Sequence, residues 1–156
     1  MKVLTLTQPW ATLVAIGEKR IETRSWQTSY RGPLAIHAAQ GFPADCREIS
    51  KSRPFCTVLR KAGYLLPYGE PLPLGQIIAV VDLQDCQPTC IKVGAEWHRS
   101  EYAPSVNELE RTFGNYKPGR WMWLLLNVRR LGAPIPAKGK LSLWEYPDDL
   151  IESGLG

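Results

Sequence analysis

Four residues near the N-terminus follow the pattern G-x-K-x-x-E-x-R: Gly17, Lys19, Glu22 and Arg24. A lysine, a carboxylate and an arginine at this spacing can hold an anion or take part in a hydrolytic reaction. Burying such groups unpaired would cost several kcal/mol, so inside a fold Glu22 must meet Lys19 or Arg24. We therefore expect Glu22 to be buried beside one of these cations. The alternative is an exposed edge strand whose charges prevent aggregation.

Tryptophans that follow cations are a second chemical feature of the chain. Three of the six tryptophans have this arrangement: Trp26 after Arg24, Trp121 after Arg120 and Trp144 after Lys140. Aromatic rings interleaved with cations are typical of proteins that hold single-stranded nucleic acid. Tyr30 and Arg31 add a phenol and a guanidinium directly after the charged segment. For Trp10 and Trp123 we favour positions in the core.

The charge is distributed unevenly along a chain whose net charge is +4. Residues 117–140 contain six Lys or Arg and no acid, whereas residues 145–156 contain four acids and no Lys or Arg. A concentrated basic segment favours a polyanionic partner. The alternative is a solvated surface with an acidic tail folded over it.

The pattern of apolar residues predicts about six strands interleaved with three or four helices. The expected strands are 3–8, 17–26, 31–39, 76–83, 121–131 and 139–146. The first expected helix begins at Pro9, and a second helical segment covers 43–63 and is divided at Pro54. Another helix runs from a capping box of Ser105 and Glu108 to Gly114, and DDLIES forms a closing helical turn. This order predicts an α+β fold with a mixed, strongly curved sheet, closed into a small barrel. The chain has neither GxGxxG nor GxxxxGK[ST], so no cofactor is expected.

The four cysteines do not form a strong metal-binding pattern. Cys46 and Cys56 are spaced C-x9-C, and Cys86 and Cys90 are spaced C-x3-C. We expect reduced cysteines and no metal, the alternative being a zinc site of Cys86, Cys90 and His98 with a fourth ligand from a distant part of the chain. No apolar run approaches the roughly 20 residues of a membrane-spanning helix. We therefore expect one cytoplasmic domain over residues 1–156 that does not contact a membrane.

The segment GEKRIETR resembles the signature of the activating signal cointegrator homology (ASCH) domain family. The resemblance extends, in order, through QPWATLV, RSWQTSYRGPLAIHA, LGQIIAVVDL and PAKGKLSLWEY, and so covers nearly the whole chain. It is strongest to coactivator-type ASCH domains and to stand-alone phage and bacterial versions. The resemblance implies a PUA-like fold, a curved β-barrel of about six strands with flanking helices. It also implies a cleft between the barrel and the first helix, which Lys19, Glu22 and Arg24 line or brace.

The same resemblance implies two kinds of function. Some family members are thought to bind nucleic acid, and others are enzymes, including an acetylcytidine amidohydrolase and a ribonuclease. Lys19 matches a lysine that is catalytic in the amidohydrolase, but Glu22 stands where that enzyme has its threonine nucleophile, and Thr23 should face the other side of the strand. A neighbouring glutamate also stabilises the charged form of Lys19, which favours anion binding over base catalysis. His37 is a candidate acid or base for a ribonuclease, although a lone histidine in a strand is more often structural.

The sequence therefore favours a module that binds RNA or single-stranded DNA. The expected phosphate ligands are Lys19, Arg24, Arg31, Arg120 and Lys140, with Tyr30 assisting, and the expected stacking rings are Trp26 and Trp144. The alternative is a ribonuclease or modified-nucleoside amidohydrolase in which Lys19 and Glu22 are catalytic.

Overall fold

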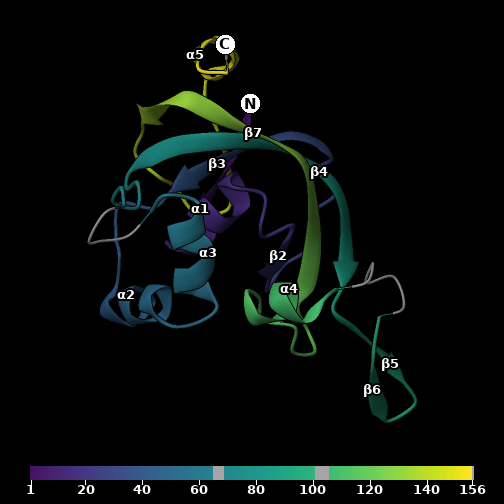
Figure 1. The fold of residues 1–156 in the computed structure, drawn as a ribbon. Helices are drawn as coiled ribbons and strands as arrows, with labels where there is room; N and C mark the ends of the chain where they lie inside the picture. The colour runs from purple at the N-terminus through teal and green to yellow at the C-terminus, as the bar shows by residue number, and fades with distance from the viewer. Residues whose placement is uncertain (65–68, 101–105, 156) are drawn as a thin grey trace.

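The computed structural model describes residues 1–64, 69–100 and 106–155 of the chain. These residues form a six-stranded sheet, a separate two-stranded hairpin and five helices (Figure 1). The strands are β1 (Lys2–Leu6), β2 (Ile21–Arg24), β3 (Gly32–Ala38), β4 (Gln76–Pro88), β5 (Cys90–Val93), β6 (Glu96–Arg99), β7 (Trp121–Pro136) and β8 (Leu143–Glu145). The helices are α1 (Trp10–Ala15), α2 (Ala44–Lys51), α3 (Phe55–Lys61), α4 (Glu108–Thr112) and α5 (Asp148–Ser153).

The main sheet is a curled half-barrel whose strand order is β2-β7-β4-β3-β1-β8. β1 and β3 run parallel, and the other neighbouring strands are antiparallel. The long strands β4 and β7 arch over α1 and α3 (Figure 1), and their pairing is interrupted by three register shifts. Such irregularities bend strands and increase their twist, which explains the curvature. The predicted α+β class and curved sheet are confirmed, and β2 and β8 are the two edges of the sheet.

Alternation along the strands fills a separate core on each face of the sheet. Leu4 of β1 pairs with Ile36 of β3, and both pack in the cluster that contains α1. Val3 and Ala35, one residue earlier on each strand, face the opposite way and pack with Ile151 of α5. A third cluster joins the outer side of α1 to α3 and α4. α1 is packed on several sides, and Lys19, four residues after its last residue Ala15, is buried again.

The main strands differ from the expected ones mainly in length. β4 continues five residues beyond the apolar run 76–83, and β7 continues five residues beyond 121–131. Each extension is held by pairing with the first residues of the other strand, which hydrophobic periodicity does not reveal. β8 covers only Leu143–Glu145 of the expected strand 139–146.

The helices are close to those expected. The division at Pro54 is confirmed, since α2 ends at Lys51 and α3 begins directly after the proline. α4 is capped by Asn107, whose side chain accepts the backbone N–H of Glu110, and the expected cap Ser105 lies outside the described residues. Among the described residues, no helix is long and apolar enough to cross a membrane.

Candidate functional site

The turn after α1 directs the motif lysine into the protein. Gly17 has φ +79°, a left-handed conformation that glycine adopts without a steric penalty. The backbone N–H groups of Glu18 and Lys19 both donate to the carbonyl of Leu13, at 3.0 Å each. This tight reversal closes the helix and places Lys19 in the interior, while Glu18 and Arg20 stay exposed. The glycine of the motif is therefore explained by backbone geometry.

The Lys19 ammonium lies in a buried cluster of charges. Its side chain is 1% exposed, and Nζ lies 3.6 Å from Oε2 of Glu22 and 3.8 Å from Oε1 of Glu110. Nζ also donates to the carbonyl of Ile21. The other carboxylate oxygen of Glu22 lies 3.6 Å from Nη1 of Arg24. The expectation that Glu22 is buried beside the motif cations is confirmed: the residue is 8% exposed and contacts both.

Glu110 of α4 is a member of this cluster that sequence reasoning missed. Its two carboxylate oxygens accept the backbone N–H groups of Arg20 at 2.8 Å and Ile21 at 3.1 Å. Asn115 N–H donates to the hydroxyl of Thr23 at 2.9 Å. β2 is thus an edge strand, as the alternative interpretation held, but α4 and the residues after it cover that edge. The covering segment supplies hydrogen bonds to an otherwise unpaired edge and buries the charges behind it.

Tyr116 places a phenol next to the buried carboxylates. Its hydroxyl is buried and has no hydrogen-bond partner among the described residues. Burial raises the pKa of Tyr116, and the nearby carboxylates of Glu110 and Glu22 add to the rise, while Arg111 opposes it. A neutral hydroxyl is therefore available there as a hydrogen-bond donor. Tyr116 lies far from the motif in the sequence, so no sequence pattern indicated that it would lie near Glu22 and Glu110.

Several hollows adjoin the charged cluster, and two of them are lined by Lys19 or by Glu22. One, of about 310 Å³, lies between the end of α1 and strands β4 and β7, and its lining includes Val14, Gly17, Lys19, Val81 and Leu125. The other, of about 280 Å³, lies on the side of α4. Its lining comprises Trp10, Glu22, Thr23, Thr112, Phe113, Gly114, Asn115 and Arg120. The motif segment thus contributes to the lining of two small concavities.

Arg120 is held at the rim of the second hollow by backbone carbonyls. Its Nε donates to Asn115 O at 3.1 Å, and its Nη2 donates to Thr23 O at 2.9 Å. No carboxylate lies within ion-pair distance of its guanidinium among residues 1–64, 69–100 and 106–155. Within the described residues no acid therefore compensates the positive charge of Arg120, in contrast to that of Arg24.

Aromatic rings surround Arg24 at the same end of β2. The Arg24 guanidinium lies 5.6 Å from the centre of the Trp26 ring, and Trp26 meets Trp123 edge-on with centres 4.6 Å apart. Trp121 is the partner of Arg24 in the β2–β7 register, so the two side chains share a face. Both Trp26 and Trp121 are partly exposed. The structure thus brings together Arg24, Trp26, Arg120 and Trp121.

Arg31 and Tyr30 hold the loop between β2 and β3. Arg31 donates through Nη1 to Thr28 O at 3.0 Å, and its Nη2 lies 3.1 Å from Oδ1 of Asp85. The Gln87 amide, the Cys86 N–H and the Arg31 guanidinium lower the pKa of Asp85, in that order and against the effect of burial. The Tyr30 hydroxyl donates to Pro33 O, and burial raises its pKa. These groups already have protein partners, and the charge of Arg31 is compensated.

Lys140 and Trp144 lie away from the motif, near β8 at the opposite edge of the sheet. The Lys140 ammonium lies 5.6 Å from the centre of the Trp144 ring. Trp144 is only 7% exposed, and its Nε1–H donates to the Thr5 hydroxyl at 3.0 Å. Trp144 thus packs in the core with Ile151 and other residues, and little of its ring is exposed for stacking with a base.

His37 is a structural residue in this fold. It is fully buried, its Nε2 lies 2.9 Å from Ala137 O, and burial lowers its pKa. Its ring packs against Trp144 and not against the motif. No group of three His, Cys, Asp or Glu side chains within the described part of the chain is arranged to hold a metal ion.

Comparisons with known proteins agree with this architecture. Two relatives, activating signal cointegrator 1 from Mus musculus and from Homo sapiens, are each 28% identical to this chain over 151 residues. The matched region is 97% of this chain and 23% of each relative. The chain thus spans less than a quarter of the length of these relatives. The crystal structure of ASCH from Zymomonas mobilis superimposes with a TM-score of 0.51 at 14% identity, covering 97% of this chain and 90% of that one.

A variant of the same Zymomonas protein gives a TM-score of 0.50, again at 14% identity, and covers 97% of this chain and 94% of that chain. At this identity the two structures establish the fold alone, the PUA-like curled sheet predicted from the resemblance. The sequence profile of the ASCH domain matches residues 4–134, which is most of the chain. The protein therefore belongs to the ASCH domain family.

Proposed function

We propose that this domain binds single-stranded nucleic acid, RNA or DNA, at the end of the sheet where β2 meets β7. The observation that carries the proposal is the position of Arg120. Two backbone carbonyls orient its guanidinium at the rim of a hollow of about 280 Å³, and no acid within the described residues compensates its charge. A preoriented, uncompensated guanidinium is a strong ligand for a phosphate group.

The neighbouring aromatic residues supply the second contact that a single strand requires. Trp26 and Trp121 are partly exposed beside Arg24, and unstacked bases bind to aromatic rings and to guanidinium planes. Membership of a family in which some domains are thought to bind nucleic acid supports the same function. In this proposal Arg120 and Arg24 contact phosphates, and Trp26 stacks with a base.

Lys19 and Glu22 have a positioning role in the proposal. Lys19 is almost completely enclosed, and its ammonium is occupied by two carboxylates and a carbonyl. A phosphate could not reach it without disrupting these contacts. Glu22 is held by Lys19 and in turn orients Arg24, which brings the guanidinium to the surface.

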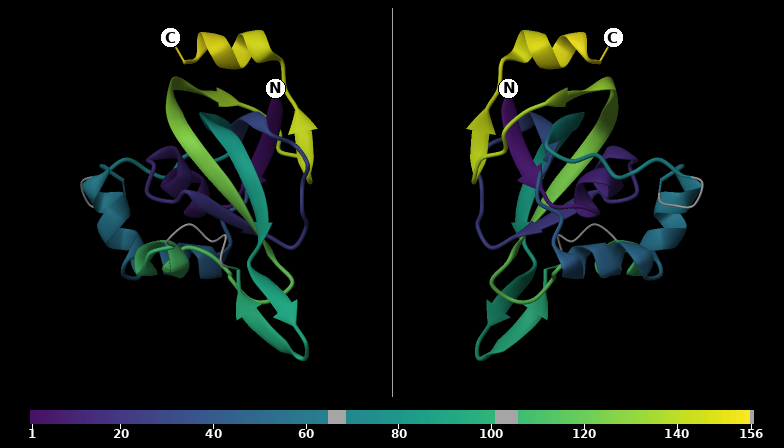
Figure 2. Two further views of the ribbon diagram at one scale, coloured as in Figure 1. Left: turned by 90° about the vertical axis from the view of Figure 1, so that its right-hand side faces the viewer. Right: turned by 90° about the vertical axis from the view of Figure 1, so that its left-hand side faces the viewer.

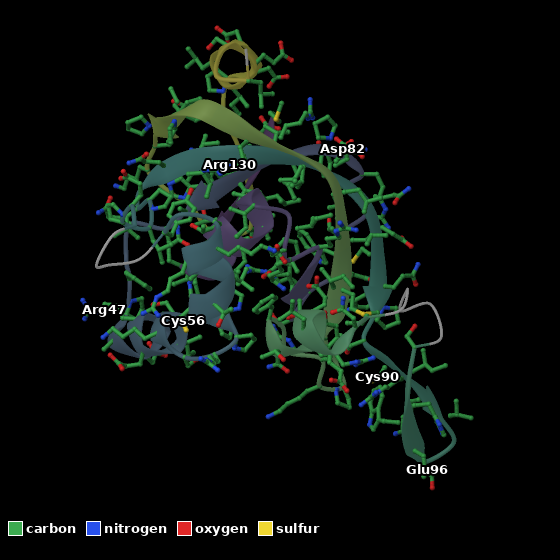
Figure 3. All side chains as sticks on the ribbon, viewed as in Figure 1. Arg47, Cys56, Asp82, Cys90, Glu96 and Arg130 are labelled. Carbon is green, nitrogen blue, oxygen red and sulfur yellow. The ribbon has the colours of Figure 1, made fainter. Side chains whose placement is uncertain are left out.

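The proposal is tested by titrating labelled single- and double-stranded RNA and DNA with the wild-type protein at several salt concentrations. Each phosphate contact on a single strand contributes about 0.7 to the log–log dependence of affinity on salt. Arg120→Gln should lower that slope by about this amount and weaken binding to all sequences alike. Arg47→Gln is the matched control, because it removes the same charge from an exposed position on α2, and Figure 3 shows Arg47 well separated from Cys90 at the base of the hairpin.

Two results would contradict the proposal. The first is no binding to any nucleic acid at low salt. The second is an equal loss of affinity in Arg120→Gln and Arg47→Gln, which would indicate attraction to net charge alone. Thermal melting of both variants must accompany the titrations, since Arg120 also bonds to the backbone of β2.

The second candidate is a hydrolase acting on RNA or on a modified nucleoside at the same place. The observation in its favour is the Tyr116 hydroxyl, which has no partner among the described residues and which burial and the charges of Glu110 and Glu22 keep neutral, so that it can donate a hydrogen bond to a developing oxyanion. Tyr116→Phe removes this hydroxyl and keeps the ring. Cleavage of RNA or deacetylation of acetylcytidine by the wild type, and its loss in this variant, would favour the enzyme.

A further inference from the structure

The β5–β6 hairpin stands out from the rest of the protein. In both views of Figure 2 it extends beyond the sheet and helices, and Figure 3 marks Cys90 at its base and Glu96 near its tip. It forms a two-stranded sheet of its own, and every residue from 91 to 99 is exposed. Trp97 is 52% exposed, an unusual position for a side chain that gains most from burial. A packing role within the described protein does not explain it.

The register of the hairpin separates its side chains into two different faces. Lys92 lies opposite Trp97, and Cys90 lies opposite Arg99. Residues opposite each other in an antiparallel pair share a face, and alternate residues along a strand share it too. One face therefore presents Lys92, Trp97 and Arg99 with no acid among its residues. We call this the cationic face.

The opposite face has a different composition. It carries Ile91 opposite His98 and Val93 opposite Glu96. The imidazole of His98 lies 3.8 Å from the carboxylate of Glu96. The two cations of the hairpin strands and the tryptophan are thus on one side, and the acid is on the other. Such segregation favours a partner that combines negative charge with flat rings, which is the chemistry of a single-stranded nucleic acid.

The base of the hairpin is attached to the segment that carries Arg120. The Thr89 N–H donates to Arg120 O at 2.9 Å, and the Thr89 hydroxyl donates to Lys117 O at 2.8 Å. Cys90 Sγ lies 3.7 Å from Tyr116 O, and the Ser100 N–H donates to Thr89 O at 3.2 Å. The hairpin therefore grows from the same end of the fold as the Arg120 site. Four strand residues at about 3.3 Å each extend roughly 13 Å beyond that base.

From this geometry we infer that the β5–β6 hairpin is an arm that holds the nucleic-acid strand beyond the Arg120 site. Lys92 and Arg99 bind phosphates, and Trp97 stacks with a base. The inference rests on the proposed function and extends it, because it assigns a second contact region to the same ligand. Charge favours this occupant over an apolar protein surface, since the cationic face has two cations around one ring.

Three variants test the arm in the full chain with the same labelled single-stranded RNA and DNA. Trp97→Ala should weaken binding about 5- to 150-fold, the range expected for loss of one stacked base, with little change in the salt dependence. Lys92→Gln with Arg99→Gln should lower the log–log salt slope by about 1.4, or 0.7 for each phosphate contact. Val93→Ala, on the opposite face of the same strand as Lys92, should leave affinity and slope unchanged.

Each outcome supports or overturns the inference. All four positions are exposed, so each variant should melt at the wild-type temperature, and a change in affinity is then not caused by unfolding. If Trp97→Ala leaves binding unchanged while Arg120→Gln weakens it, the arm is refuted and the proposed function stands. Equal effects of Trp97→Ala and Val93→Ala, or a change in oligomeric state alone, also overturn it. If the wild type binds no nucleic acid, the proposed function fails and the arm fails with it.

Discussion

Replacing Lys19 by methionine tests whether one buried ammonium compensates the two carboxylates around it. Nζ of Lys19 lies 3.6 Å from Glu22 and 3.8 Å from Glu110, and each carboxylate is only 10% exposed. Methionine fills a similar volume without charge. The variant therefore leaves two carboxylates near each other, away from water, with one fewer cation between them.

The size of the effect follows from what each carboxylate keeps. Removing one partner of a buried ion pair typically costs about 3–5 kcal/mol. Glu22 retains Arg24, and Glu110 retains the N–H groups of Arg20 and Ile21. We therefore expect a loss near the lower limit, about 3 kcal/mol of unfolding free energy. For a domain of this size the melting temperature should fall by about 6–12 °C.

Urea denaturation measures this loss, and Lys51→Met of α2 provides the matched control. Lys51 also pairs with a glutamate three residues away, and its ion pair with Glu48 is shorter, at 2.8 Å. However, those two side chains are 67% and 73% exposed. Exposed pairs are screened by water, so Lys51→Met should cause no measurable change. The comparison therefore shows whether burial or the ion-pair distance determines the loss of unfolding free energy.

A cost below about 1 kcal/mol for Lys19→Met, which is the range of an exposed pair, would show that the Lys19 ammonium does not compensate the two carboxylates. An equal cost for Lys51→Met would contradict the role of burial. Lys19→Gln retains a hydrogen-bond donor for the Ile21 carbonyl but lacks the charge. It should lose nearly as much stability as Lys19→Met, and full stability in this variant would show that the hydrogen bond matters and the charge does not.

Gly17→Ala should cost about 1–2 kcal/mol of stability, because φ of +79° is strained for alanine; an unchanged melting curve would exclude that strain. Burial lowers the pKa of His37, so below the ordinary value of about 6.5 the unfolded chain binds a proton that the folded chain does not. Stability should therefore fall as the pH drops from 7 to 5, and His37→Gln should reduce this dependence, as denaturation at several pH values would show. Trp26→Ala should weaken single-strand binding about 5- to 150-fold without altering the salt slope. It should also lower the melting temperature, because Trp26 packs against Trp123, and normal affinity in the folded variant would exclude stacking there.

The sequence alone predicted the features that depend on residues close together in the chain. The stop of α1 at Gly17 and the division of α2 and α3 at Pro54 follow from local backbone preferences. The contact of Glu22 with Lys19 and Arg24 was also predictable, since all three lie within six residues and a buried carboxylate needs a cation. The family and the curved α+β sheet were likewise accessible, from the motifs and from the order of the elements.

The tertiary structure decided which distant residues complete the site. Glu110 and Tyr116 lie 91 and 97 residues from Lys19 in the sequence, and a carboxylate on a short helix gives no indication of the backbone groups it will bind. The strand order placed Lys140 at the edge opposite β2, although the basic segment 117–140 is continuous in sequence. The same packing buried Trp144 and left Trp97 exposed on a hairpin that was not predicted. Local patterns determine which groups need a partner, but long-range packing determines which partner they meet, because that choice depends on strand pairing between segments far apart in the chain.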